Sequence, residues 1–139
     1  MIRPCQVNEL HKMLTMAEKF FYEAGEPGTF SHLGFIDHWQ QVYGQNAGVI
    51  FTDDDYKCMF GCYVNINPYS GLLELNESFY YAENGKGGLL LKAVIKWADA
   101  IGVKAFYLHH QTANMGTRLS QFYSKCGFKL KFARYLREV

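Results

Sequence analysis

A short glycine-rich segment, Gly85-Lys86-Gly87-Gly88, has the composition of an anion-binding loop. It stands between a strand-like stretch and a helical pattern that begins near Leu89. Glycines there let the backbone approach a bound anion, and the free N–H groups of a helix N-terminus favour phosphate. The side chain of Lys86 would add a positive charge. The segment is not a Walker loop, because no Ser or Thr follows the lysine, and it is not a dinucleotide fingerprint. A plain glycine turn is the alternative interpretation.

Two adjacent histidines, His109 and His110, lie at the end of a predicted strand and are candidate bases. An unperturbed imidazole titrates near pH ~6.5, so either side chain could exchange a proton at neutral pH. Neighbouring strand residues face opposite sides, which means that at most one of the two faces a given cleft. Surface or capping histidines are the interpretation that the sequence alone favours.

The cysteines form no metal-binding or disulfide pattern. On one strand, Cys58 and Cys62 would face the same side but would lie too far apart to bind one metal ion. No known zinc spacing adds a histidine to them. We therefore expect no metal, and buried free thiols in a reducing compartment, at positions Cys5, Cys58, Cys62 and Cys126.

The periodicity of the apolar residues predicts helices and strands around these candidates. Three consecutive strands joined by short turns must form an antiparallel meander, and the strand after the next helix must run parallel to the last of them. The predicted fold class is therefore α/β (α+β), with a mixed, mostly antiparallel sheet flanked by helices. After an extended start at 2–5, the predicted helices are 8–24 with Asn8 as N-cap, 31–44, 89–101 and 117–126, and the predicted strands are 49–52, 57–66, 72–81, 103–109 and 128–136.

The length and composition fit one globular domain spanning residues 1–139. Apolar residues make up 49% of the chain, which is enough for a core. A net charge of +1 argues against general binding of duplex DNA, and leaves a nucleic-acid role for the basic C-terminal strand as a weaker alternative. No apolar run is long enough to span a membrane and no signal peptide is visible, so we expect a cytoplasmic protein without a membrane partner.

Several segments in a fixed order resemble the GNAT superfamily of acetyl-CoA-dependent N-acetyltransferases, in its small single-domain form known from bacteria and phages. The opening Ile2-Arg3-Pro4 before an amphipathic helix is similar to the start of that family. Residues 76–81, leading into the glycine segment, are similar to its fourth strand and pyrophosphate loop. The most specific piece is the Tyr-x-x-x-Gly-Phe pattern formed by Tyr123, Gly127 and Phe128. The resemblance covers nearly the whole chain and implies the GNAT fold.

The resemblance also implies a reaction, the direct attack of a primary amine on acetyl-CoA. An ammonium group must lose a proton before it attacks a thioester, so a carboxylate is needed nearby. Glu77 is the candidate general base. Glu74 is the second choice, and it would face the opposite side of the strand. The alternative interpretation of Glu77 is an exposed strand carboxylate. Tyr123 occupies the position of the family's general acid, which protonates the leaving thiolate. The alternative is a core tyrosine whose hydroxyl is satisfied locally.

Acetyl-CoA would act as co-substrate and would lie along the predicted fourth strand. In the family pattern an Arg or Gln stands three positions before the first glycine of the loop, and here that position holds Ala82 or Asn84. This departure supports a different class of function, a catalytically degenerate GNAT-fold module that binds a macromolecular partner. The implied cofactor-binding residues are Phe79, Tyr80, Tyr81, Gly85, Lys86, Gly87, Gly88 and Asn114. The sequence does not identify the acceptor amine, small molecule or protein, and the exposed edge of the sheet leaves a homodimer open.

Overall fold

A five-stranded sheet lies at the centre of the computed structural model, which describes residues 1–83, 85–109, 117–131 and 137. The strands lie side by side in chain order, with the first four antiparallel and the fifth parallel to the fourth. The predicted meander and the parallel crossover are both confirmed. In chain order the strands are β1 (Arg3–Pro4), β2 (Gly48–Thr52), β3 (Cys58–Ile66), β4 (Leu73–Ala82) and β5 (Ala105–Tyr107).

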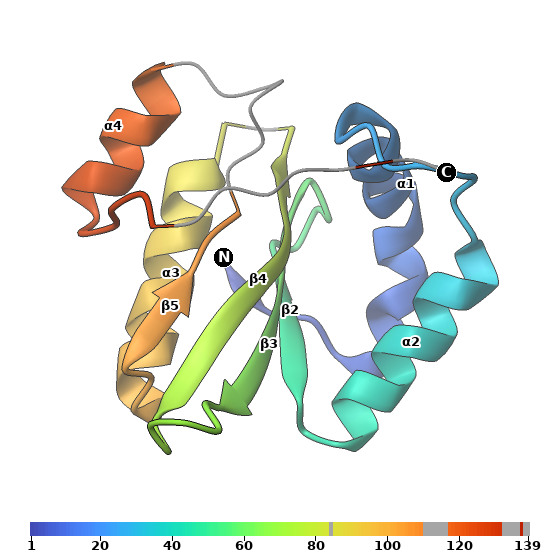
Figure 1. Cartoon of the computed structure of the whole chain (residues 1–139). Coiled ribbons are helices and arrows are strands. Elements are labelled where there is room, and N and C mark those ends of the chain that lie inside the picture. Colours follow the sequence, from blue (N-terminus) through green and yellow to red (C-terminus); the bar gives the residue numbers. More distant parts are fainter. Residues whose placement is uncertain (84, 110–116, 132–136, 138–139) are drawn as a thin grey trace.

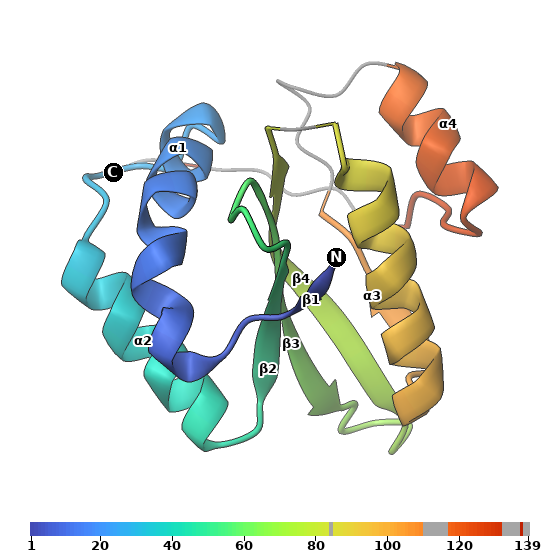
Figure 2. The same ribbon diagram turned by 180° about the vertical axis from the view of Figure 1, so that it is seen from behind.

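Helices cover both faces of this sheet (Figures 1 and 2). The 3-10 helix η1 (Val7–Met13), α1 (Leu14–Glu23) and α2 (His32–Gly44) lie on one face. The other face carries α3 (Gly87–Ile101) and α4 (Thr117–Lys125). Each face buries its own apolar core, one around Trp39 and Phe79 and the other around Phe60 and Leu90. We call these the α1–α2 face and the α3–α4 face.

Three predicted elements differ from the structure, and one of them, the predicted strand 103–109, is only Ala105–Tyr107. The first helix begins as a 3-10 turn at Val7, one residue before the predicted Asn8 cap, because the Glu9 carboxylate accepts the Gln6 N–H at 3.0 Å and closes the first turn there. At the other end, residues 128–131 form no strand. The Phe128 N–H instead bonds to the Tyr123 carbonyl at 2.9 Å, which turns the chain back against α4. Residues 132–136 of that predicted strand lie outside the described residues.

One extra residue in β4 decides which way its side chains point. Gly61 pairs with Phe79 and Cys62 pairs with Glu77, so Ser78 forms a β-bulge without a partner in β3. Paired residues share a face, which places Glu77 on the α3–α4 face with Cys62. Phe79 lies on the opposite face, and its ring covers Gly61 so closely that a Cβ there would lie 2.3 Å from the ring. The bulge thus separates two residues that regular alternation would place together.

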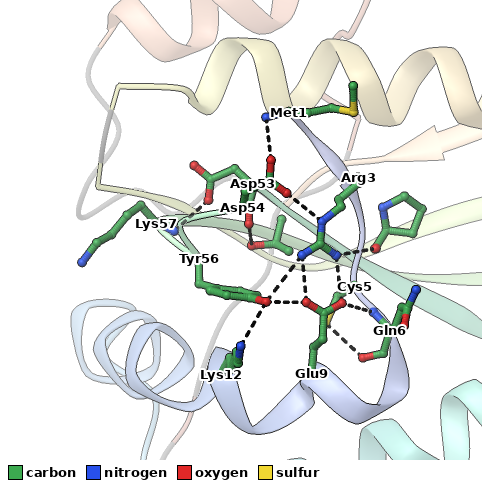
Figure 3. Close-up of polar contacts among 12 residues, drawn as sticks. Met1, Arg3, Cys5, Gln6, Glu9, Lys12, Asp53, Asp54, Tyr56 and Lys57 are labelled. Atoms are coloured by element: carbon green, nitrogen blue, oxygen red, sulfur yellow. Dashed lines mark hydrogen bonds and ion pairs between the residues drawn. The ribbon is translucent and has the colours of Figure 1, made fainter.

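A polar cluster joins the start of the chain to the β2–β3 turn (Figure 3). The Arg3 guanidinium donates to both Glu9 oxygens at 2.8 Å and to Asp54 at 3.0 Å. The Tyr56 hydroxyl donates to Glu9 at 2.5 Å, and the Lys12 ammonium lies 4.8 Å from the centre of the Tyr56 ring. The hydrogen bonds to Glu9 hold the pKa of its carboxyl group well below the usual range, and those from Arg3 have the largest effect. The cluster therefore keeps its charges at neutral pH and loses them only in acid.

We expect Tyr56→Phe to lower the free energy of unfolding by roughly 1–2 kcal/mol, because it removes a donor to a half-enclosed carboxylate and leaves the ring in place. Urea unfolding at neutral pH measures this difference. Tyr69→Phe is the matched control, since the Tyr69 side chain is almost fully exposed and should contribute nothing. Equal stability of the two variants would show that the hydroxyl of Tyr56 does not hold the cluster together.

Candidate functional site

The strands β4 and β5 part midway along the sheet. Only Glu74–Asn76 pair with Ala105–Tyr107, and β4 then continues to Ala82 with no further strand partner on that edge among the described residues. Backbone N–H and C=O groups on an unpaired edge can bind an extended ligand as an added strand would. Beyond the point at which the two strands separate, the edge of β4 is therefore open to an extended ligand.

Glu77 is the first β4 residue beyond the last β4–β5 pair, and it is buried. Its Oε2 atom lies 3.4 Å from Nδ1 of His109, which follows the end of β5. Burial raises the pKa of Glu77 to about 8, although a hydrogen bond from the His109 backbone N–H acts in the opposite direction. A carboxyl group with this pKa exchanges a proton near neutral pH, which suits a general base.

Tyr123 reaches the same region from α4. Its side chain is 8% exposed in the core of the α3–α4 face, which also contains Tyr80. The hydroxyl is buried and has no hydrogen-bond partner among the described residues. Burial raises the pKa of this hydroxyl well above its usual value, and the nearby Tyr80 and Glu77 raise it further. A buried, unpartnered hydroxyl beside the candidate base is free to bond a ligand atom.

The glycine segment forms the turn into α3. Gly85 has φ +73°, a left-handed conformation that glycine adopts without strain, and the helix begins at Gly87. No described side chain caps this N-terminus, and the first helical backbone bond runs from the Leu90 N–H to the Lys86 carbonyl at 2.9 Å. The amide groups of Gly87 and Gly88 precede this bond at the helix N-terminus, where backbone N–H groups favour an anion. The Tyr80 hydroxyl donates to the Gly87 carbonyl and ties this turn to β4.

Lys86 has a protein partner that the sequence did not indicate. Its Nζ atom lies 3.6 Å from Oδ2 of Asp53, whose side chain is 1% exposed at the end of β2. Asp53 also accepts the Lys57 N–H at 2.9 Å. The sequence suggested only a turn at the Asp53-Asp54-Asp55 run, since nothing in it indicates which acid is buried. The positive charge of Lys86 is therefore balanced by the buried carboxylate of Asp53.

The side chains of three further candidates lie on the α1–α2 face, away from Glu77. Phe79 packs its ring against Trp39 on the α1–α2 face, so only its backbone adjoins the gap between β4 and β5. Tyr81 donates its hydroxyl to Glu23 at 3.3 Å on that same face. Glu74 lies on the α1–α2 face, on the opposite side of the sheet from Glu77. Its carboxylate accepts hydrogen bonds from the side-chain amides of Asn65 at 2.9 Å and Asn67 at 3.2 Å.

Two further candidates, Asn114 and His110, lie outside the described residues. The described part of the chain contains no cluster of three side chains suited to a metal ion, and its four cysteines are free thiols. Within the same part, every helix is too short or too polar to cross a bilayer.

The sequence matches no family model and no curated protein, but the fold is similar to that of many solved structures. A provisionally assigned acetyltransferase from Arthrobacter sp. FB24 has a TM-score of 0.79 at 16% identity, over 100% of this chain and 96% of the other. A predicted acetyltransferase from Clostridium acetobutylicum, solved with acetyl-CoA, has a TM-score of 0.75 at 14% identity, over 100% and 95%. A transcriptional regulator from Bacillus halodurans C-125 has a TM-score of 0.77 at 13% identity, over 100% and 99%. The mixed sheet with helices on both faces is similar to that of these acetyltransferases, and this chain has the GNAT acetyltransferase fold.

Proposed function

We propose that this chain transfers the acetyl group of acetyl-CoA to a primary amine. The observation that carries the proposal is the pair formed by Glu77 and Tyr123 on the α3–α4 face. Glu77 is a buried carboxyl group with a pKa of about 8 where β4 and β5 part, and Tyr123 has a buried hydroxyl with no hydrogen-bond partner among the described residues. Acyl transfer from a thioester to an ammonium group needs one group to accept a proton and another to protonate the leaving sulfur. The two side chains supply these roles.

The coenzyme fits the surrounding backbone. Its pantetheine arm would bond to the unpaired edge of β4 across Phe79, Tyr80 and Tyr81, as an added strand does. Its diphosphate would bind to the uncapped amide groups at the start of α3, from Gly85 to Gly88. Lys86 would contribute less charge than a lysine without an acidic partner, because Asp53 lies behind it.

Each catalytic side chain then has one task. Glu77 accepts a proton from the acceptor ammonium, directly or through water, so that the neutral amine can attack. Tyr123 donates its hydroxyl proton to the sulfur as the thioester bond breaks, and the second proton of the attacking nitrogen restores the hydroxyl, so no free thiolate is released. Burial strengthens both effects, because few water molecules compete for the proton in an enclosed site.

A second candidate function is a binding module that has the fold without the reaction. Two observations favour it. Asp53 neutralises the charge of Lys86 in the glycine loop. The position at which the family has Arg or Gln holds Ala82 or Asn84. The similarity to a transcriptional regulator shows that proteins given other names share this fold.

Thermal unfolding with increasing acetyl-CoA separates the two candidates. An acetyl-CoA concentration about a hundredfold above the dissociation constant should add about 2.7 kcal/mol, which corresponds to a rise of several degrees in Tm. S-acetylpantetheine, which lacks the diphosphate, is the control ligand and should give a smaller shift. Mass spectrometry of a panel of primary amines then tests for acetylated product. A protein that neither shifts nor acetylates any amine is not an acetyltransferase.

A further inference from the structure

The proposed reaction must release a proton from a closed site. An acceptor ammonium loses two protons as it becomes an amide, and the leaving sulfur keeps one of them as a thiol. One proton per turnover therefore passes to solvent. Glu77 accepts this proton, but its side chain is only 6% exposed. The proton must therefore pass from the carboxyl group to solvent before the next turnover.

We propose that His109 is a proton relay that links Glu77 to solvent, an inference that rests on the proposed function. Its Nδ1 atom lies 3.4 Å from Oε2 of Glu77, and its side chain is 40% exposed. The backbone N–H of the same residue bonds to the Glu77 carboxyl group and fixes the position of the carboxyl beside the ring. One residue thus contacts the buried base and reaches the surface.

The other titratable groups near Glu77 are unsuited to this task. Cys62 lies opposite it on β3, Tyr80 follows it on β4, and Tyr123 approaches from α4. Burial raises the pKa of Cys62 to about 12 and raises the pKa of both tyrosines well above their usual value. All three keep their protons at neutral pH, whereas imidazole can both gain and lose one there.

The relay is balanced in protons. Glu77 takes one proton from the acceptor ammonium and becomes a neutral carboxylic acid. That proton moves to Nδ1 of the neutral imidazole, which restores the carboxylate and forms an imidazolium. The imidazolium gives one ring proton to water or to a buffer base on its exposed side and returns to the neutral form. No bond other than N–H and O–H changes, and no further reactant is needed.

The test is chemical rescue of His109→Ala. In a neutral buffer whose base is a poor proton acceptor, we expect the kcat of this variant to fall about tenfold to a hundredfold. The rise in Tm that acetyl-CoA induces should be unchanged. Added imidazole should restore kcat in a concentration-dependent manner at constant pH and ionic strength, because it can occupy the vacated space and carry the proton. A purely structural role of His109 would not give this dependence on buffer.

Two controls define the outcomes. His38→Ala removes an imidazole that bonds to Tyr63 on the α1–α2 face, and it should keep full activity and show no response to imidazole. Glu77→Gln should stay inactive in imidazole, because the base itself is missing. Wild-type activity in His109→Ala, or a loss that imidazole does not restore, overturns the relay alone. A wild-type chain that acetylates no amine overturns the proposed function and the relay with it.

Discussion

Replacement of Tyr123 by Phe should lower kcat about a hundredfold and leave the Kd for acetyl-CoA within about twofold. The hydroxyl has no hydrogen-bond partner among the described residues and is buried near Glu77 and Tyr80, so the variant loses only the proton that the hydroxyl gives to the leaving sulfur. Steady-state kinetics on the best amine and a thermal-shift titration measure the two quantities. Equal losses of turnover and affinity would show that Tyr123 only shapes the coenzyme site.

The stability of the same variant gives an independent check. A buried hydroxyl without a hydrogen bond costs folding energy, so Tyr123→Phe should be at least as stable as the wild type without ligand. Tyr43→Phe is the matched control. The Tyr43 hydroxyl donates to the Cys5 carbonyl at 2.6 Å and accepts the Ile50 N–H at 3.1 Å, so its removal should cost about 1–3 kcal/mol. A destabilised Tyr123→Phe would reveal a protein partner for this hydroxyl.

Glu77→Gln should lower kcat/KM by about a hundredfold or more and remove one step from its pH profile. The pKa of Glu77 is raised to about 8 by burial, so wild-type activity should increase as the pH passes through this value and the carboxylate forms. The amide cannot titrate. Because acceptor amines titrate as well, both proteins are compared on the same amine. An identical profile for the two proteins would mean that Glu77 is not the titrating base.

The raised pKa also predicts how stability depends on pH. In the unfolded chain this carboxyl group loses its proton near pH ~4.3, whereas the folded chain keeps it up to a pH of about 8. The folded state therefore binds more protons between these values, and wild-type stability declines as the pH rises through that window. Glu77→Gln lacks this decline and should become more stable than the wild type by a few kcal/mol at pH ~8. Urea unfolding of both proteins across this range tests the sign.

The order of the elements could be predicted because it depends on local patterns. Alternation and helical spacing indicated the meander, and the glycine segment marked the start of α3 within two residues. The 3-10 geometry of η1 was missed because it depends on the bonds of Glu9 rather than on apolar spacing.

The site was predicted in part, and the missing contacts are those between distant segments. The pairing of Lys86 with Asp53 and that of Glu77 with His109 each join residues more than 30 positions apart. Neither contact has a local signal in the sequence. His109 was assigned to the surface for this reason, although its backbone and ring both contact Glu77.

The bulge in β4 implies that the number of residues in this strand matters more for the candidate site at Glu77 than for the sheet. If Ser78 were deleted, the pairs of Gly61 with Phe79 and of Cys62 with Glu77 would become consecutive, and every side chain of β4 would keep its face. The ladder would then be regular, because each β4 residue in it would pair with one β3 residue. A bulge increases local twist and bends its strand, and this one, at Ser78, lies two residues beyond the last β4–β5 pair. The extra residue thus serves the separation of the two strands, and a change in the length of β4 would alter the site before it altered the fold.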